Sequence, residues 1–200
     1  LLYRYSGQRD IRIGVPSASR PRQETQGLVG FFINTLVLRA ELDGRLRFNE
    51  LLAATRQTVL GAQAHQDLPF EQLLEAFPQA REQGLFQVMF NHQSEARLAN
   101  SGQQLADLRV EGLEWGTQTA QFDLSLDTQE TAEGLWATLT YATDLFDAAT
   151  PKRMARHWQN LLQGMLGDPN QRVTQLPMLE RLEQQVMVEQ WNDTAQDYPL

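Results

Sequence analysis

Three histidines, His65, His92 and His157, are the residues of this chain best suited to acid/base chemistry or metal binding. They lie far apart in the sequence, and none has an acidic residue four positions further on. The chain has no cysteine and no HExxH motif. Because zinc sites are normally built from Cys and His ligands at short, regular spacings, this pattern predicts no metal site.

These histidines are more typical of structural positions than of a catalytic base. His65 follows a predicted helix, where its charge would suit the helix dipole, and His157 is predicted on the exposed side of another helix. His92 ends a predicted buried strand among polar neighbours, which favours a satisfied polar strand end. No serine lies in a G-x-S-x-G motif, and no glycine-rich loop has phosphate-binding spacing. We predict no catalytic residue in the chain.

Asn34 and Thr35 interrupt an otherwise apolar run from Phe31 to Leu38. The run is apolar at both side-chain parities, which predicts a strand in the centre of its sheet, covered on both faces. A buried amide that lacks a hydrogen-bond partner costs about 1–3 kcal/mol. Asn34 is therefore expected either to tie two segments together or to line a cavity in which a ligand supplies the partner.

The elements around this run alternate between strands and helices. Ile11 to Val15 reads as a short strand, and the apolar stripe from Phe48 to about His65 predicts a helix. A second helix is expected to start with Asp67 as its cap and to end before Pro78. The next strand is Leu85 to Phe90, which is apolar at both parities and has Gln87 as its one polar interior residue.

The C-terminal half reads as a loop, a hairpin and a long helix. We expect a surface loop over 94–106, a weak strand over 108–115, and a hairpin formed by 120–128 and 135–141. On the hairpin, Asp123 and Asp127 share a parity with Ser125, which favours a solvated face over an acid/base pair. A long helix should follow, with Thr150 as cap and Pro151 in its first position. Its predicted apolar face consists of Met154, Trp158, Leu161, Leu162 and Met165.

Composition limits the possible partners and the compartment. The 200 residues are 42% hydrophobic and 21% charged, which is ordinary for a globular domain, and the net charge is -8. This charge argues against nucleic acid or anionic membrane as a partner. The absence of cysteine fits a cytoplasmic protein, and no apolar run is long enough to cross a membrane. Both ends of the chain look cut from something longer, since it opens in what reads as the last turn of a helix closed by Gly7.

Three ordered motifs resemble one family. IGVPSASRPRQETQGLVGFFINTLVLR, HQDLPFEQLLEA and LFQVMFNHQ look like the C-terminal half of the condensation domain of nonribosomal peptide synthetases. FDLSLD, LTYATDLFD and RMARHWQNLLQGM also fit that family. The tail LPMLERLEQQVMVEQWNDTAQDYP looks like a linker followed by the first residues of an adenylation domain. The resemblance thus divides the chain into a lobe over 1–170 and a linker over 171–200.

The resemblance implies an α/β (α+β) fold, a lobe like that of chloramphenicol acetyltransferase with a mixed sheet covered by helices. In the family, two such lobes enclose a tunnel in which an acceptor amine attacks a donor thioester. The family's catalytic HHxxxDG motif belongs to the N-terminal lobe and is absent here. The resemblance therefore implies a C-terminal lobe that does not catalyse condensation alone.

Site residues and partners follow from the same resemblance. The candidates for the substrate tunnel are Asn34, Thr35, Gln87 and His92. Arg20 and Glu24 match an Arg and a Glu of the family and are candidates for an ion pair within their loop. His65, Asp67 and Pro69 match a motif that we interpret as structural, because helix capping accounts for those residue types.

The implied partners are the N-terminal lobe of the same domain, donor and acceptor carrier proteins, and an adjoining adenylation domain. No cofactor is expected to bind directly, because the substrates are carried on the phosphopantetheine of the carrier proteins. An alternative is a noncatalytic docking or scaffold lobe that binds carrier proteins or neighbouring domains. A stand-alone acyl-CoA transferase of related fold is disfavoured because the DFGWG motif is absent.

Overall fold

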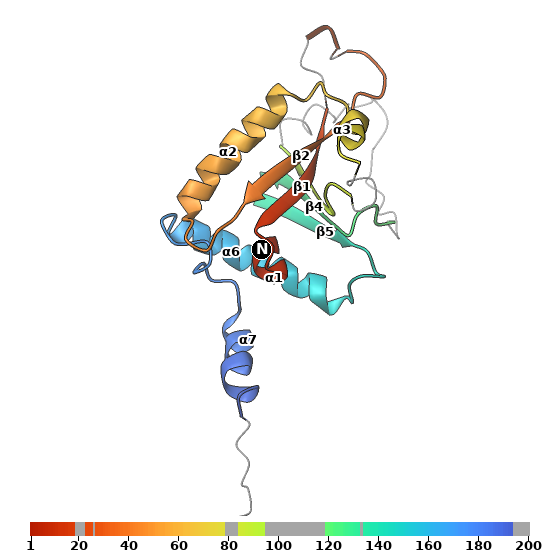
Figure 1. Ribbon diagram of the computed structural model, residues 1–200. Helices are drawn as coiled ribbons and strands as arrows, with labels where there is room; N and C mark the ends of the chain where they lie inside the picture. Colours follow the sequence, from red (N-terminus) through yellow and green to blue (C-terminus); the bar gives the residue numbers. More distant parts are fainter. Residues whose placement is uncertain (19–22, 26, 79–83, 95–118, 133, 194–200) are drawn as a thin grey trace, which may run out of the picture.

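A computed structural model describes residues 1–18, 23–25, 27–78, 84–94, 119–132 and 134–193, and these form a mixed sheet flanked by helices (Figure 1). The described sheet has five strands in the order β2-β1-β3-β4-β5. In chain order they are β1 (Asp10–Ser17), β2 (Asn34–Glu41), β3 (Val88–Gln93), β4 (Leu124–Thr131) and β5 (Gly134–Tyr141).

The three inner strands run in one direction and the two outer strands run against them. β1 pairs with β3 and β3 with β4 in parallel, whereas β2 and β5 pair antiparallel with β1 and β4. The hairpin predicted near 120–141 is confirmed, as is the prediction that the strand after Leu85 is central. The mixed sheet covered by helices is also confirmed.

The predicted position of the strand around Asn34 is wrong. Within the described sheet β2 is the outermost strand, and it begins at Asn34, after the apolar residues that suggested a central strand. Phe31 lies before the strand and is 88% exposed. Both parities read as apolar because the run joins two different environments, an exposed segment and a half-buried strand.

Helices connect the strands and cover part of the sheet. They are α1 (Leu2–Ser6), α2 (Phe48–Ala64), α3 (Phe70–Ala76), α6 (Ala149–Gly167) and α7 (Arg181–Gln185), together with the 3-10 turn η1 (Gln23–Thr25) and the π-helical turn η2 (Val186–Gln190). Gly7 ends α1 with φ 71°, as predicted, because glycine adopts this left-handed conformation without strain. None of the described helices is both long and apolar enough to cross a bilayer.

Helix α6 begins earlier than predicted. Its first residue is Ala149, whose backbone N–H donates to the side-chain Oδ1 of Asp147 at 3.1 Å. Asp147, and not Thr150, therefore accepts the hydrogen bond at the start of the helix. The expected loop over 94–106 and strand over 108–115 lie outside the described residues, apart from Ser94.

The buried core lies between the sheet, α6 and the chain that comes after α6. Its hydrophobic members are Ile11, Leu124, Met154, Leu161, Val173 and Leu176. A Cβ at Gly164 would lie 2.6 Å from Pro177 Cδ, so the segment after α6 crosses that helix in close contact. The chain from 171 to 177 thus packs against the body, and α7 extends away from it (Figure 1).

The prediction that His157 is exposed is wrong. The ring is 2% exposed, and the buried residues of α6 are Pro151, Met154, His157 and Leu161. The sequence pattern placed Trp158 on the inner face, but Trp158 is only half-buried. A polar ring can occupy this buried stripe because the tyrosine of α1 and a glutamate of α7 supply its hydrogen-bond partners.

Candidate functional site

Four polar side chains lie near one end of the sheet, and we call Ser17, Asn34, His92 and Thr128 the polar row. Ser17 is the last residue of β1 and is paired with Asn34, while His92 is paired with Thr128. All four share the sheet face that carries Ile13, because side chains alternate along each strand. This end of the sheet holds the carboxyl ends of the parallel strands, where open α/β sheets commonly bind ligands.

Asn34 has hydrogen-bond partners for both ends of its side-chain amide. Nδ2 donates to the backbone oxygens of Gln66 and Leu68, each at 2.8 Å. Oδ1 accepts from the backbone N–H of Thr35 at 2.9 Å and of Phe70 at 3.0 Å. The amide thereby joins the start of β2 to the connection between α2 and α3.

The bond from Phe70 makes Asn34 the cap of α3. Phe70 is the first residue of that helix, and its N–H would otherwise lack a partner, because helices leave their first N–H groups unbonded. The prediction that Asp67 is the cap is wrong, since Pro69 holds the N-cap position and makes no side-chain cap bond. Ser17 adds a second link to the same connection, because its Oγ donates to Gln66 Oε1 at 2.8 Å.

His92 and Thr128 form the other half of the polar row. His92 Nδ1 lies 3.0 Å from Thr128 Oγ1, and that hydroxyl donates to the backbone oxygen of Asn91 at 3.2 Å. With its hydrogen directed at Asn91, the Thr128 oxygen acts as acceptor, so Nδ1 carries the proton of a neutral His92 ring. Nε2 then keeps the lone pair and could accept a proton or hydrogen bond.

The structure separates the other predicted tunnel residues from this pair. Thr35 follows Asn34 in β2, so its side chain points to the opposite face of the sheet. Gln87 precedes β3 and lies at the opposite end of the sheet, where its backbone oxygen accepts from Leu124 N at 3.4 Å. Of the four candidates, Asn34 and His92 share one face and one end.

The candidate ion pair in the loop after β1 stays a prediction. Glu24 lies in η1, whereas Arg20 is outside the described residues.

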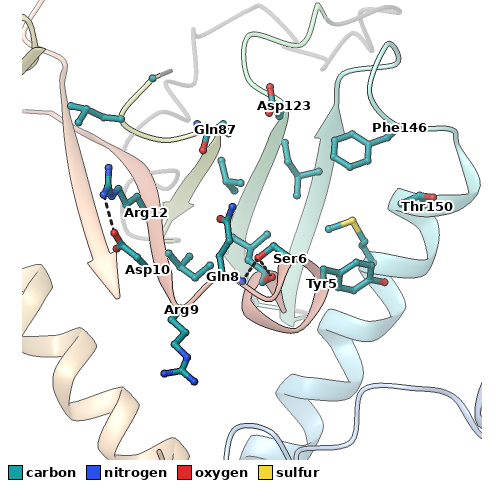
Figure 2. Close-up of a pocket in the computed structure, with 17 residues that line it drawn as sticks. Tyr5, Ser6, Gln8, Arg9, Asp10, Arg12, Gln87, Asp123, Phe146 and Thr150 are labelled. Carbon is teal, nitrogen blue, oxygen red and sulfur yellow. Dashed lines mark hydrogen bonds and ion pairs between the residues drawn. The ribbon is translucent and has the colours of Figure 1, made fainter. Parts of the chain in front are cut away.

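A cavity of about 740 Å³ lies at the Gln87 end of the sheet. Figure 2 shows Asp10 and Arg12 of β1 on one side of it and Phe146 and Thr150 on the other. Hydrogen bonds from Arg39 and Arg12, together with their charges, lower the pKa of Asp10 and keep it ionised. The cavity combines this exposed ion-pair cluster with apolar walls and lies away from the polar row.

Sequence reasoning missed two members of the polar row. Thr128 is 5% exposed and continues the inward-facing parity of Leu124 and Leu126, so the alternation itself marked it as buried. Ser17 lies at the end of β1 beside the bend, and only the register with Asn34 reveals its position. Among the residues that the structure describes, no group of three or more His, Asp or Glu side chains could hold a metal ion.

Comparison with known proteins identifies the family. The profile described as "Condensation domain" matches residues 1–188. This chain belongs to the condensation domain family. The resemblance to condensation domains of nonribosomal peptide synthetases is thereby confirmed at the level of the domain.

Known condensation proteins are much longer than this chain. It is 47% identical over 200 residues to a linear gramicidin synthase of Brevibacillus parabrevis, covering 98% of this chain and 4% of that protein. The solved four-domain nonribosomal peptide synthetase holo-AB3403, bound to AMP and glycine, superposes with a TM-score of 0.78 at 19% identity, covering 92% and 15% of the two chains. The first condensation domain of the CDA synthetase gives a TM-score of 0.67 at 18% identity, covering 90% of this chain and 40% of that one.

Proposed function

We propose that this chain is the C-terminal lobe of a condensation domain that forms peptide bonds between carrier-bound thioesters. The observation that carries the proposal is a family match over residues 1–188 in a sequence that has no HHxxxDG motif. The chain also spans 40% of a solved condensation domain, a share that suits one lobe of two. In this proposal residues 1–170 are the lobe, and residues 171–200 are the linker and the start of an adenylation domain.

An exposed apolar segment before β2 supports a missing partner lobe. Val29 is 104% exposed and Phe31 is 88% exposed, and Leu28 and Ile33 are also exposed. Contiguous apolar surface of this kind usually marks an interaction site, because exposure to water gains nothing for these side chains. We propose that the N-terminal lobe of the same domain covers residues 27–33.

The proposed reaction is an acyl transfer without oxidation or reduction. The amine nitrogen of the acceptor aminoacyl group attacks the thioester carbonyl carbon of the donor. A C–N bond forms and the C–S bond breaks, and the donor phosphopantetheine leaves as a thiol once it has taken up the proton that the amine loses. The N-terminal lobe would supply the catalytic base through its histidine motif, and this chain would supply part of the tunnel wall.

Within this wall we propose distinct tasks for the candidate residues. Asn34 positions the segment 66–70 by its four hydrogen bonds and limits the tunnel at that end of the sheet. His92, with Nδ1 bonded to Thr128, presents Nε2 toward bound substrate. Thr35 and Gln87 would contact other parts of the carried groups, because they lie on another face and at another end.

Photo-crosslinking tests whether these residues line the tunnel. Donor and acceptor carrier proteins bearing phosphopantetheine with a photoreactive group would be irradiated with the intact synthetase. We expect adducts within residues 34–35 and 87–93, identified by peptide mass spectrometry. Adducts confined to other segments would overturn the tunnel assignment. Carrier binding without adducts in these segments would support the alternative of a noncatalytic docking or scaffold lobe.

A further inference from the structure

Tyr5, His157 and Glu183 form a polar cluster that joins three helices, and we call this cluster the α7 clamp. His157 Nδ1 lies 2.7 Å from the Tyr5 hydroxyl oxygen, and Nε2 lies 2.8 Å from Glu183 Oε2. Tyr5 belongs to α1, His157 to α6 and Glu183 to α7. Both ring nitrogens are therefore bonded in the interior of the protein, where an unbonded nitrogen would be costly.

One carboxylate oxygen of Glu183 serves two purposes. Besides binding His157, Oε2 accepts the backbone N–H of Glu180 at 3.1 Å, which is one half of the capping box at the start of α7. The bond that starts the helix and the bond that holds it to α6 therefore share a single acceptor atom. Glu183 can perform both tasks only while α7 lies against the body.

Helix α7 has little other support. It has five residues and continues into the five-residue turn η2. Isolated helices shorter than about 12–15 residues are marginal in water. The apolar side chains Leu182, Val188 and Trp191 are all exposed, so within the described part of the chain they add little packing. The Arg156–Glu180 ion pair at 3.2 Å is on the surface and contributes little.

The chain leading to α7 is held independently of the clamp. Arg4 Nη1 donates to the backbone oxygen of Leu176 at 2.6 Å, and Asn160 Nδ2 donates to that of Met178 at 3.0 Å. Leu176 itself is 2% exposed. The path of the chain is thus fixed up to Met178, and the clamp governs the residues beyond it.

We propose that the α7 clamp is a conformational device: α7 is helical and points in one direction only while Glu183 binds His157. When the clamp opens, α7 loses its cap and its contact with α6 together, and residues 181–190 become a flexible connection. The clamp therefore switches the chain after Met178 between a rigid arm and a tether, which sets how freely any following segment moves relative to the sheet.

Hydrogen exchange in the intact protein tests this coupling. In Glu183→Ala we expect amides of residues 181–190 to exchange about tenfold faster, because the cap and the contact with α6 are lost together, with α6 unchanged. The matched control is Glu189→Ala, since Glu189 Oε2 accepts only a bond from Gln185 Nε2 at 2.8 Å within the same helical segment. Equal exchange in wild type and Glu183→Ala, or equal effects of the two variants, would overturn the proposal.

A second pair of variants separates docking from capping. His157→Leu leaves Glu183 able to cap α7 but removes its bond to α6, so the coupling predicts faster exchange in residues 181–190. Because a change at a buried ring can unfold the body, Tyr5→Phe is measured alongside; it removes one hydroxyl and keeps the aromatic ring. If α7 stays protected in every folded variant of His157 and Tyr5, Glu183 acts only as a cap and the clamp proposal is wrong.

Discussion

Asn34 Oδ1 accepts the backbone N–H of Phe70 at 3.0 Å, so a strand residue caps a helix that begins 36 positions later in the sequence. The same side chain binds the carbonyls of Gln66 and Leu68. The start of β2, the α2–α3 connection and the first turn of α3 therefore depend on one amide.

We predict that Asn34→Ala lowers the free energy of unfolding by about 1–3 kcal/mol, because several backbone groups lose their partner. Urea unfolding of the intact protein would measure it. Asn192→Ala is the matched control, since its Nδ2 also donates to two carbonyls, those of Met187 and Val188, but on the surface. A loss no larger than in Asn192→Ala would contradict this account. The proposed tunnel role further predicts lower turnover per folded molecule in Asn34→Ala.

Thr128→Val should destabilise the protein by about 1–2 kcal/mol although it preserves the shape of the side chain. The hydroxyl that bonds both His92 and the Asn91 carbonyl is removed from a buried position. Thr138→Val on the neighbouring strand is the control, because Thr138 is exposed and valine suits a strand. Thermal unfolding of both variants is the measurement, and similar melting temperatures for the two would argue against the polar row.

Gly14→Ala should cost about 1–3 kcal/mol through overpacking. A Cβ at Gly14 would lie 2.3 Å from Phe86 Cε2, and that ring is held between Phe70 and Phe122, at centroid distances of 5.9 and 5.5 Å. Gly61→Ala in α2 is the control, since nothing lies within 4 Å of its Cβ position, and it should stabilise by about 0.5–1 kcal/mol. Unfolding midpoints that move in the same direction for both variants would refute the close packing.

Acid should open the α7 clamp. Partial burial raises the pKa of Glu183, but the hydrogen bonds from His157 and the Glu180 N–H, with the nearby positive charges, outweigh it and lower this pKa below its usual 4.5. A carboxyl with a lowered folded pKa stabilises the folded state above the unfolded pKa, and this contribution is lost as pH falls through the folded pKa. The groups facing it are His157, Arg156 and the hydroxyl of Tyr5 beyond the ring.

The measurement for this prediction is the difference in melting temperature between wild type and Glu183→Gln across pH 3 to 7, a range set around the usual glutamate pKa of about 4.3. We expect wild type to be the more stable at neutral pH and the difference to vanish in acid below the lowered pKa. A difference that persists unchanged in acid would show that the Glu183 carboxylate is not the source.

The sequence predicted the elements whose signals are local. Strict alternation gave the β4–β5 hairpin, and helical spacing gave α2 to within one residue. It did not predict the edge position of β2, the capping of α3 or the burial of His157, because each depends on a distant partner. The bonds concerned join residues 36, 152 and 26 positions apart.

The candidate site was predicted to the same extent. Asn34 and His92 stood out because a polar residue in or beside an apolar strand needs a partner. That they share a face and an end, whereas Thr35 and Gln87 do not, follows only from the register of the strands. The connection over 66–70, which receives three of the bonds from Asn34, carried no signal that linked it to β2.

Peptide formation from loaded carrier proteins tests the central claim most directly. Donor and acceptor carrier proteins charged with thioester substrates would be incubated with the purified 200-residue chain and, in parallel, with the intact synthetase, and the product on the acceptor would be weighed by mass spectrometry. We predict a peptide bond with the intact synthetase and no product with the chain alone, because the HHxxxDG motif is absent from it. Turnover by the chain alone would contradict its assignment as a noncatalytic C-terminal lobe.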